Sequence, residues 1–257
     1  MGKIIVFANQ KGGVGKTTSA VNVAAAVGFK GKRVLLVDLD PQGNTSSGVG
    51  INKKNMKLST YDVLIGRCSA ESCIVETEYK NLSIMPSNIS LAGAEFDLTK
   101  PEIEDRYHRL KNALTLVKDN YDYIFIDCPP SLGILTINAL TASDGVIVPM
   151  QCEFYSLEGL SQLMLSIKTC KRLYNPKLEL LGILITMYNG RLNLSMQVMD
   201  ELKKYYAGKL FKNTILRNVR LSEAPSYGVP IHLYDARCSG TQAYRELAKE
   251  LTKRNGG

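Results

Sequence analysis

The chain has 257 residues, of which 45% are hydrophobic and 22% charged, and it carries a formal net charge of +8. These values are typical of globular proteins and exclude a disordered chain, a collagen and a small disulfide scaffold. No stretch reaches the roughly 18 uninterrupted apolar residues of a membrane-spanning helix. The apolar run at residues 4–8 is also too short for a signal peptide, so we expect a cytoplasmic protein.

The predicted elements alternate between apolar strands and longer amphipathic helices. In chain order they are a strand at 3–8, a helix at 17–29, strands at 33–38 and 82–86, a helix at 106–120, strands at 123–127 and 145–149, a helix at 157–174, a strand at 178–187, a helix at 193–206, a strand at 210–216 and a helix at 241–253. The rest of 41–105 is expected to hold short helices and loops.

This alternation predicts an α/β fold with a three-layer, doubly wound, mostly parallel sheet. Runs such as VLLVD, YIFID and GVIVP are apolar at successive positions, as strands covered by helices on both faces must be. No Pro/Gly/Ser-rich linker or repeat divides the chain, and we therefore expect a single domain over residues 1–257.

Positive charge is concentrated in the last part of the sequence. Residues 187–257 contain six lysines, six arginines and six acids, a net charge of +6, whereas the preceding 186 residues carry only +2. Such a basic segment indicates either a polyanionic partner or a solvated surface.

The cysteines and histidines predict no metal site. The six cysteines have no CxxC spacing and only two histidines are present, which makes a zinc site improbable and predicts reduced, mostly buried thiols. His108 and His232 are expected to have no catalytic role. Tyr205 and Tyr206 are expected to form a helix packing face rather than a base-stacking surface.

The strongest motif is KGGVGKTT at residues 11–18, between the first predicted strand and the first predicted helix. Its glycines allow backbone N–H groups to point at phosphate oxygens next to a helix N-terminus. Lys16 would reach the β- and γ-phosphates, and the hydroxyl of Thr17 would ligate Mg²⁺. The usual pattern has a glycine where this chain has Gln10, and a second lysine, Lys11, precedes the glycines instead.

Three aspartates follow predicted strands and support this site. Asp38 and Asp40 come after the second strand, and Asp127 ends the YIFID strand. Because ligands of doubly wound sheets bind at the carboxyl ends of the strands, these acids should converge with the glycine-rich loop. Asp38 and Asp127 are the candidate Mg²⁺ ligands beside Thr17.

Together with KGGVGKTT, the segments VDLDPQGNTSSGVG, IFIDCPPSLGILTINAL, VPMQCEFYSLEGL and RNVRLSEAPSYGVPI resemble the bacterial ParA/Soj partitioning ATPases over essentially the whole chain. This family has a deviant Walker-A P-loop, which it shares with MinD and the nitrogenase iron protein.

The resemblance implies a role for each matching residue. Lys11 matches a lysine that crosses an ATP-sandwiched homodimer to the partner's nucleotide, Lys16 the P-loop lysine and Asp40 the acid that orients the attacking water. Nucleotide contacts are implied for Lys11, Gly12, Gly13, Val14, Gly15, Lys16, Thr17 and Thr18. Arg217 and Asn218 would lie near adenine, although relatives often carry proline where this chain has Leu216. Arg191 and Arg220 would contact DNA without sequence preference.

The resemblance also implies a cycle. The protein would bind ATP and Mg²⁺, dimerise, bind double-stranded DNA of the nucleoid and hydrolyse ATP slowly. A ParB-type centromere-binding partner would stimulate hydrolysis and release the dimer.

Three other classes are considered. A MinD-like membrane ATPase needs an inserting terminal helix, but the last helix lacks Phe and Trp on its apolar face and is expected to pack on the sheet. An iron-protein-like reductase needs cluster-bridging cysteines, and Cys128 alone does not match. An operator-binding regulator needs a helix-turn-helix extension, and the sequence begins directly at its first strand.

Overall fold

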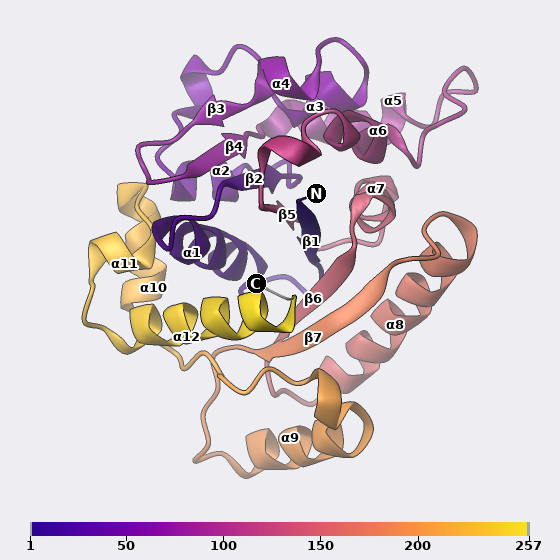
Figure 1. The fold of residues 1–257 in the computed structure, drawn as a ribbon. Helices are drawn as coiled ribbons and strands as arrows, with labels where there is room; N and C mark the ends of the chain where they lie inside the picture. Colours follow the sequence, from indigo (N-terminus) through magenta and orange to yellow (C-terminus); the bar gives the residue numbers. More distant parts are fainter. Residues whose placement is uncertain (1, 256–257) are drawn as a thin grey trace.

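The fold is described from a computed structural model, which places residues 2–255. Seven strands form one sheet: β1 (Lys3–Phe7), β2 (Val34–Asp38), β3 (Val75–Glu76), β4 (Leu82–Met85), β5 (Tyr123–Asp127), β6 (Gly145–Met150) and β7 (Glu179–Ile185). Their order is β3-β4-β2-β5-β1-β6-β7. All neighbours are parallel except the short edge strand β3, which pairs antiparallel with β4. The predicted mostly parallel α/β architecture is confirmed (Figure 1).

The sheet is covered by helices on both faces. The α-helices are α1 (Lys16–Phe29), α2 (Asn44–Gly48), α3 (Thr60–Leu64), α4 (Ala70–Cys73), α5 (Ala94–Asp97), α6 (Arg109–Thr115), α7 (Ile134–Ala142), α8 (Ser156–Leu173), α9 (Asn193–Tyr206), α10 (Arg220–Glu223), α11 (Ile231–Tyr234) and α12 (Ser239–Arg254). Short 3₁₀ helices are η1 (Lys53–Asn55), η2 (Ile89–Gly93), η3 (Lys118–Asn120), η4 (Ala207–Lys209) and η5 (Ala224–Tyr227).

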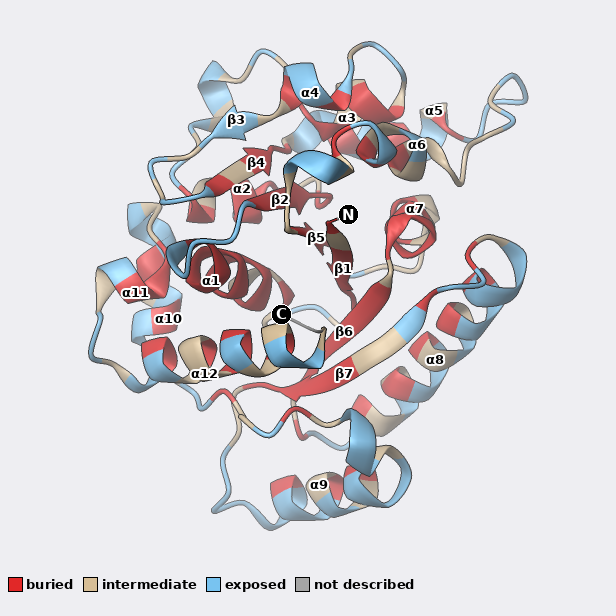
Figure 2. Ribbon diagram, viewed as in Figure 1, coloured by how far each residue is buried: buried red, intermediate tan, exposed pale blue. Residues whose placement is uncertain are grey.

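Each face of the sheet has its own hydrophobic core. Ile4 and Val6 of β1 point to the core formed with α6, α7 and α8, whereas Ile5 and Phe7 point to the core formed with α1 and α12. Because side chains alternate along a strand, a strand that is apolar at every position can serve both cores. The central strands and α1 are accordingly buried along most of their length (Figure 2).

The closing helix α12 packs on the sheet as predicted. Tyr244, Leu247, Ala248 and Leu251 are buried in the same core as α1. At its end the Arg254 guanidinium donates to the backbone oxygens of Leu181 and Leu210, at 3.2 and 2.6 Å. None of the described helices combines the length and the apolar character needed to cross a bilayer.

Two predicted elements differ from the structure. The prediction of a strand at 210–216 is wrong, because this segment forms isolated bridges, Ile183 with Leu210 and Tyr188 with Leu216, and not a continuous ladder with β7. Its middle is polar, and the N–H of Lys212 donates to Glu250 of α12 instead of to a strand. The helix expected at 106–120 is shorter, since α6 spans only Arg109–Thr115 before η3. Residues 41–105 contain short helices and loops, as expected.

The six cysteines are free thiols, four of them buried, in agreement with the sequence prediction. His232 is buried in α11. The expected packing face is confirmed for Tyr206, which packs against the core, and is wrong for Tyr205, which is 77% exposed.

Candidate functional site

Strand register brings the predicted acids together at one edge of the sheet. Asp38, the last residue of β2, is paired with Asp127, the last residue of β5. On its other side Asp127 is paired with Phe7, the last residue of β1. The loop that follows β1 therefore leaves the sheet beside both carboxylates, as expected for the carboxyl edge of a doubly wound fold.

The glycine-rich loop forms an open cradle before α1. Gly13 and Gly15 have φ angles of 71° and 81°, which side-chain-bearing residues rarely adopt, and a Cβ at Gly13 would meet no atom within 4 Å. No side chain caps the first turn of α1. Lys16 bends back over the loop, and its Nζ lies 3.1 Å from the backbone oxygen of Lys11. Free backbone N–H groups, a helix N-terminus and an ammonium group together make an anion site.

Asp127 receives two hydroxyl groups on one oxygen and has its other oxygen free of protein partners. Thr17 donates to Oδ2 at 2.7 Å, and Thr45 of α2 donates to the same atom at 2.6 Å. Oδ1 is buried without a hydrogen-bond partner. Burial raises the pKa of Asp127 to about 6, and the two threonine hydroxyls oppose the rise. A buried, unpaired carboxylate oxygen beside a threonine hydroxyl fits a hard cation such as Mg²⁺.

Both carboxylate oxygens of Asp38 accept hydrogen bonds from the segment that follows β2. Its Oδ1 accepts the N–H of Asp40 at 3.2 Å, and its Oδ2 accepts the N–H and the hydroxyl of Ser46 at 2.8 and 2.7 Å. Burial raises the pKa of Asp38 to about 7, and the charge of Asp127 adds to the rise. Ser87 donates its hydroxyl to the Asp40 backbone oxygen at 2.9 Å. The loop is therefore fixed from β2 and from the end of β4.

Burial shifts the pKa values of the ionisable groups at this edge of the sheet. Burial lowers the pKa of Lys16, while nearby Asp127 opposes that shift. The pKa values of both buried carboxyl groups are raised, so these groups resist carrying charge as they stand. A polyphosphate beside Lys16 and a divalent cation beside Asp127 would each favour the charged form of its neighbour.

The Lys11 side chain forms an ion pair with a residue outside the glycine-rich loop. Its ammonium group pairs with Glu153, in the segment between β6 and α8, and both side chains are partly exposed. The Lys11 ammonium is therefore held by a partly exposed ion pair.

A second hollow adjoins the loop. It has a volume of about 520 Å³ and is lined by Arg191 and Arg217 together with Glu153, Met187 and Leu216. Gln151, which also lines it, donates to the backbone oxygen of Gly13 at 2.8 Å and so connects this hollow to the cradle. The predicted base-proximal Arg217 and the predicted DNA-contacting Arg191 thus share one cavity.

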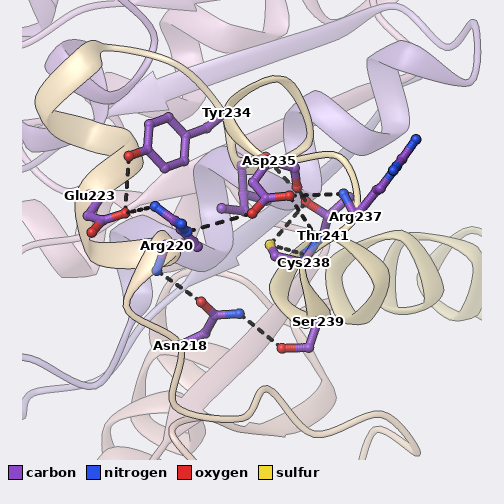
Figure 3. A network of polar contacts seen from close by, with 10 residues as sticks. Asn218, Arg220, Glu223, Tyr234, Asp235, Arg237, Cys238, Ser239 and Thr241 are labelled. Carbon is purple, nitrogen blue, oxygen red and sulfur yellow. Dashed lines mark hydrogen bonds and ion pairs between the residues drawn. The ribbon is translucent and has the colours of Figure 1, made fainter.

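The remaining predicted residues do not line this second hollow. Asn218 does not line this cavity, and its amide donates to Ser239 at the start of α12 at 2.9 Å. Arg220 begins α10 and pairs with acidic side chains (Figure 3). A Cβ added to Gly12 would meet only Pro130, at 4.0 Å. Val14 is buried, and its backbone oxygen accepts a hydrogen bond from the hydroxyl of Thr186. Thr18 lines a separate hollow of about 390 Å³ between α1, α2 and η5.

Three contributors were not identified from the sequence. Thr45 sits seven residues after Asp38, and Gln151 and Glu153 follow β6. Thr45 could have been identified from the sequence, because it is a hydroxyl residue that follows closely on a strand ending in aspartate. Gln151 and Glu153 become recognisable only once the order of β1 and β6 is known. Within residues 2–255 no three His, Cys, Asp or Glu side chains group as a metal site. A Mg²⁺ ion beside Asp127 and Thr17 would take its remaining ligands from phosphate and water oxygens.

The fold and this site define a P-loop nucleoside triphosphatase, and the AAA domain family profile matches residues 2–180. The sporulation initiation inhibitor protein Soj of Bacillus subtilis is 55% identical over 98% of both chains. The chromosome partitioning protein ParA of Caulobacter vibrioides is 46% identical, covering 98% of this chain and 94% of its own. The chain belongs to the ParA/Soj family of chromosome-partitioning ATPases.

A solved structure, cobyrinic acid a,c-diamide synthase from Mycobacterium smegmatis with bound ADP and magnesium, is 36% identical with a TM-score of 0.87. The alignment covers 100% of this chain and 96% of the synthase chain. The Pyrococcus furiosus cell division ATPase MinD is 25% identical with a TM-score of 0.79, over 98% and 99% of the two chains.

Proposed function

We propose that this chain, acting as a single ATPase domain, uses ATP with Mg²⁺ to control its own dimerisation and its binding to DNA. One observation carries the proposal: the open cradle at Gly13, the Lys16 ammonium and the unpaired oxygen of Asp127 converge at one edge of the sheet. The solved relative with bound ADP and magnesium supports the choice of ligand.

Each residue has a distinct task in this proposal. Residues 11–18 hold the phosphates through backbone N–H groups, and Lys16 neutralises the β- and γ-phosphates. Thr17 and Asp127 hold Mg²⁺, and Asp38 acts from its outer shell because both of its oxygens already accept hydrogen bonds. When bound, Mg²⁺ neutralises charge that develops on the phosphates. Asp40 orients the attacking water.

The second hollow is proposed to receive the base. Arg217 lies in its wall, and the segment with Asn218 follows directly. Adenine placed there would lie beside the phosphates, since Gln151 links this hollow to Gly13.

Lys11 is proposed to act across the dimer. Its side chain is partly exposed and pairs with Glu153. A dimer formed around two nucleotides would present Arg191 and Arg220 from both subunits. Two subunits together make twice the phosphate contacts of one, so the dimer should bind duplex DNA far better than a single subunit. Its affinity should also fall more steeply with salt.

Two further elements complete the proposal. A ParB-type partner stimulates hydrolysis and releases the dimer from the nucleoid. The membrane-associated alternative loses support, because the apolar face of α12, with Tyr244 and Leu247, is buried in the core.

The test is binding of the purified protein to a fluorescent random-sequence duplex at fixed salt with ATP, ADP or no nucleotide. We expect tight, sequence-independent binding with ATP only. Lys16→Ala should abolish the nucleotide effect, whereas Lys30→Ala, an exposed lysine at the end of the same helix, should not. Absence of DNA binding in every nucleotide state would refute the DNA part of the proposal.

A further inference from the structure

Arg220 is held between two carboxylates (Figure 3). Its NH1 group lies 2.9 Å from Glu223 Oε2, and its Nε lies 3.7 Å from Asp235 Oδ2. The guanidinium side chain is still 54% exposed. The two carboxylates outnumber the one guanidinium that they share, so their pairing offsets the attraction of Arg220 for an approaching phosphate.

Both carboxylates are themselves anchored. Glu223 Oε2 also accepts the hydroxyl of Tyr234 at 3.0 Å. Asp235 Oδ1 accepts the backbone N–H groups of Arg237 and Cys238, each at 3.1 Å. The other ion pairs of this region, such as Lys249 with Glu246, join neighbouring turns of a single helix. The Arg220 cluster instead joins α10, α11 and the turn before α12.

The cluster is connected to the proposed base cavity. Arg217 lines that cavity. The next residue, Asn218, accepts the backbone N–H of Arg220 on its Oδ1 at 2.9 Å. The amide of Asn218 at the same time donates to Ser239 of α12. A displacement of Arg217 on nucleotide binding would therefore pull directly on the backbone that positions Arg220.

A second connection runs through α2. Thr45 and Ser46 of this helix bond to Asp127 and Asp38. At the end of α2, the Cα of Gly50 lies so close to Gly228, next to η5, that a Cβ on Gly228 would come within 2.9 Å of it. Since η5 continues directly from α10, a shift of α2 would be transmitted to α10 through this closely packed backbone contact.

We infer that Glu223 and Asp235 compete with DNA phosphates for Arg220, and that they thereby set the DNA affinity of the protein and its dependence on nucleotide. This inference rests on the proposed function. Before ATP binds, the guanidinium is satisfied internally and releases no counterions on meeting DNA. Movement of the Arg217–Asn218 segment or of η5 opens the cluster and presents Arg220 to phosphate.

The test measures anisotropy of a fluorescent random-sequence duplex with nucleotide-free protein. The variant Glu223→Gln/Asp235→Asn removes two negative charges, while the amide oxygens can still accept from Tyr234 and from the Arg237 and Cys238 N–H groups. The matched control Glu246→Gln/Asp200→Asn removes two charges from other exposed ion pairs of the same region. Thermal unfolding verifies that both variants are folded.

We expect the cluster variant to bind DNA about 10-fold more tightly than the control, with a salt slope steeper by about 1, as for one additional phosphate contact. Adding Arg220→Gln to the cluster variant should return its affinity to that of the control. An affinity equal to or below the control, or a gain that survives Arg220→Gln, overturns the inference.

Measurements on the wild-type protein separate this inference from the proposed function. ATP-dependent DNA binding by the wild type, with no gain in the cluster variant, overturns only the role of Glu223 and Asp235. Absence of wild-type DNA binding with ATP overturns both.

Discussion

The hydroxyl of Thr45 lies 2.6 Å from Oδ2 of Asp127, the same oxygen that Thr17 contacts from the other side. This hydrogen bond attaches α2 to the centre of the sheet edge. It also helps to stabilise the ionised form of a carboxylate whose pKa burial would otherwise raise further.

Thr45→Val should raise the Mg²⁺ concentration needed for half-maximal ATP hydrolysis. The substitution keeps the side-chain shape and removes one hydrogen bond to a charged group, a contribution of about 1.5–3 kcal/mol, or roughly 10- to 100-fold. The measurement is ATPase activity against Mg²⁺ at saturating ATP. Thr45→Ser keeps the donor and should stay near wild type, and equal effects of both substitutions would contradict the assigned contact.

Asp40→Ala should leave ATP binding intact and reduce hydrolysis by about 10²- to 10⁴-fold, the usual contribution of a positioned acid or base. Because Asp40 Oδ1 also accepts the N–H of Gln42, Asp40→Asn is needed as the variant that preserves the loop. Single-turnover hydrolysis and the lifetime of the protein–DNA complex are measured together, and trapped complexes are expected. Normal turnover by Asp40→Asn would exclude the proposed role.

Glu153→Gln should lower the protein concentration at which ATP drives dimerisation, because it releases Lys11 from its intramolecular ion pair. Lys11→Ala should bind ATP as a monomer and fail to dimerise. Sedimentation velocity over a range of concentrations measures both. Dimerisation of Lys11→Ala at the wild-type concentration would show that this lysine does not act across the interface.

Arg191→Glu should weaken DNA binding and reduce the salt slope by about 1 or more, since one phosphate contact is replaced by repulsion. Arg172→Glu reverses the same charge on the exposed end of α8 and serves as the control. Because Arg191 lines the cavity shared with Arg217, nucleotide affinity must be measured in parallel. A loss of DNA binding matched by an equal loss of nucleotide binding would assign Arg191 to the nucleotide.

Buried His232 is expected to make the folded protein less stable at acidic pH. Burial lowers the pKa of His232, whose Nδ1 has no hydrogen-bond partner and whose ring packs 5.4 Å from that of Phe29. Below its unfolded pKa of about 6.5 the unfolded chain binds a proton that the folded chain resists, so the free energy of unfolding decreases as the pH falls. Urea unfolding at several pH values should show a smaller decrease in His232→Phe than in the wild type. Identical pH profiles would contradict this origin.

The sequence predicted the central strands and the position of the phosphate loop well, because both depend on local signals. Apolar strands such as YIFID are short and uninterrupted, and KGGVGKTT requires glycines at fixed positions. The convergence of Asp38 and Asp127 followed from the general geometry of parallel sheets and agrees with their paired register.

Other features depend on contacts that no local pattern reveals. Helix α7 was not predicted, because most of its residues are buried and it shows no polar face. Helix α6 was predicted too long; its start is fixed by Asn138 of α7, whose side chain accepts the N–H of Leu110 and donates to the carbonyl of Arg106. The pairing of Lys11 with Glu153, and of Arg220 with Asp235, likewise required the fold.

The contacts of Arg254 have a consequence for how copies of this protein can meet. At one border of the sheet β3 has only two residues, and at the other the segment after α9 and the Arg254 guanidinium occupy backbone groups of β7. Neither border presents a long free row of N–H and C=O groups, the template on which chains pair irreversibly. In the proposed cycle, association would therefore depend on side-chain surfaces and bound ligands, and contacts of that kind can be undone each time the ligand is consumed.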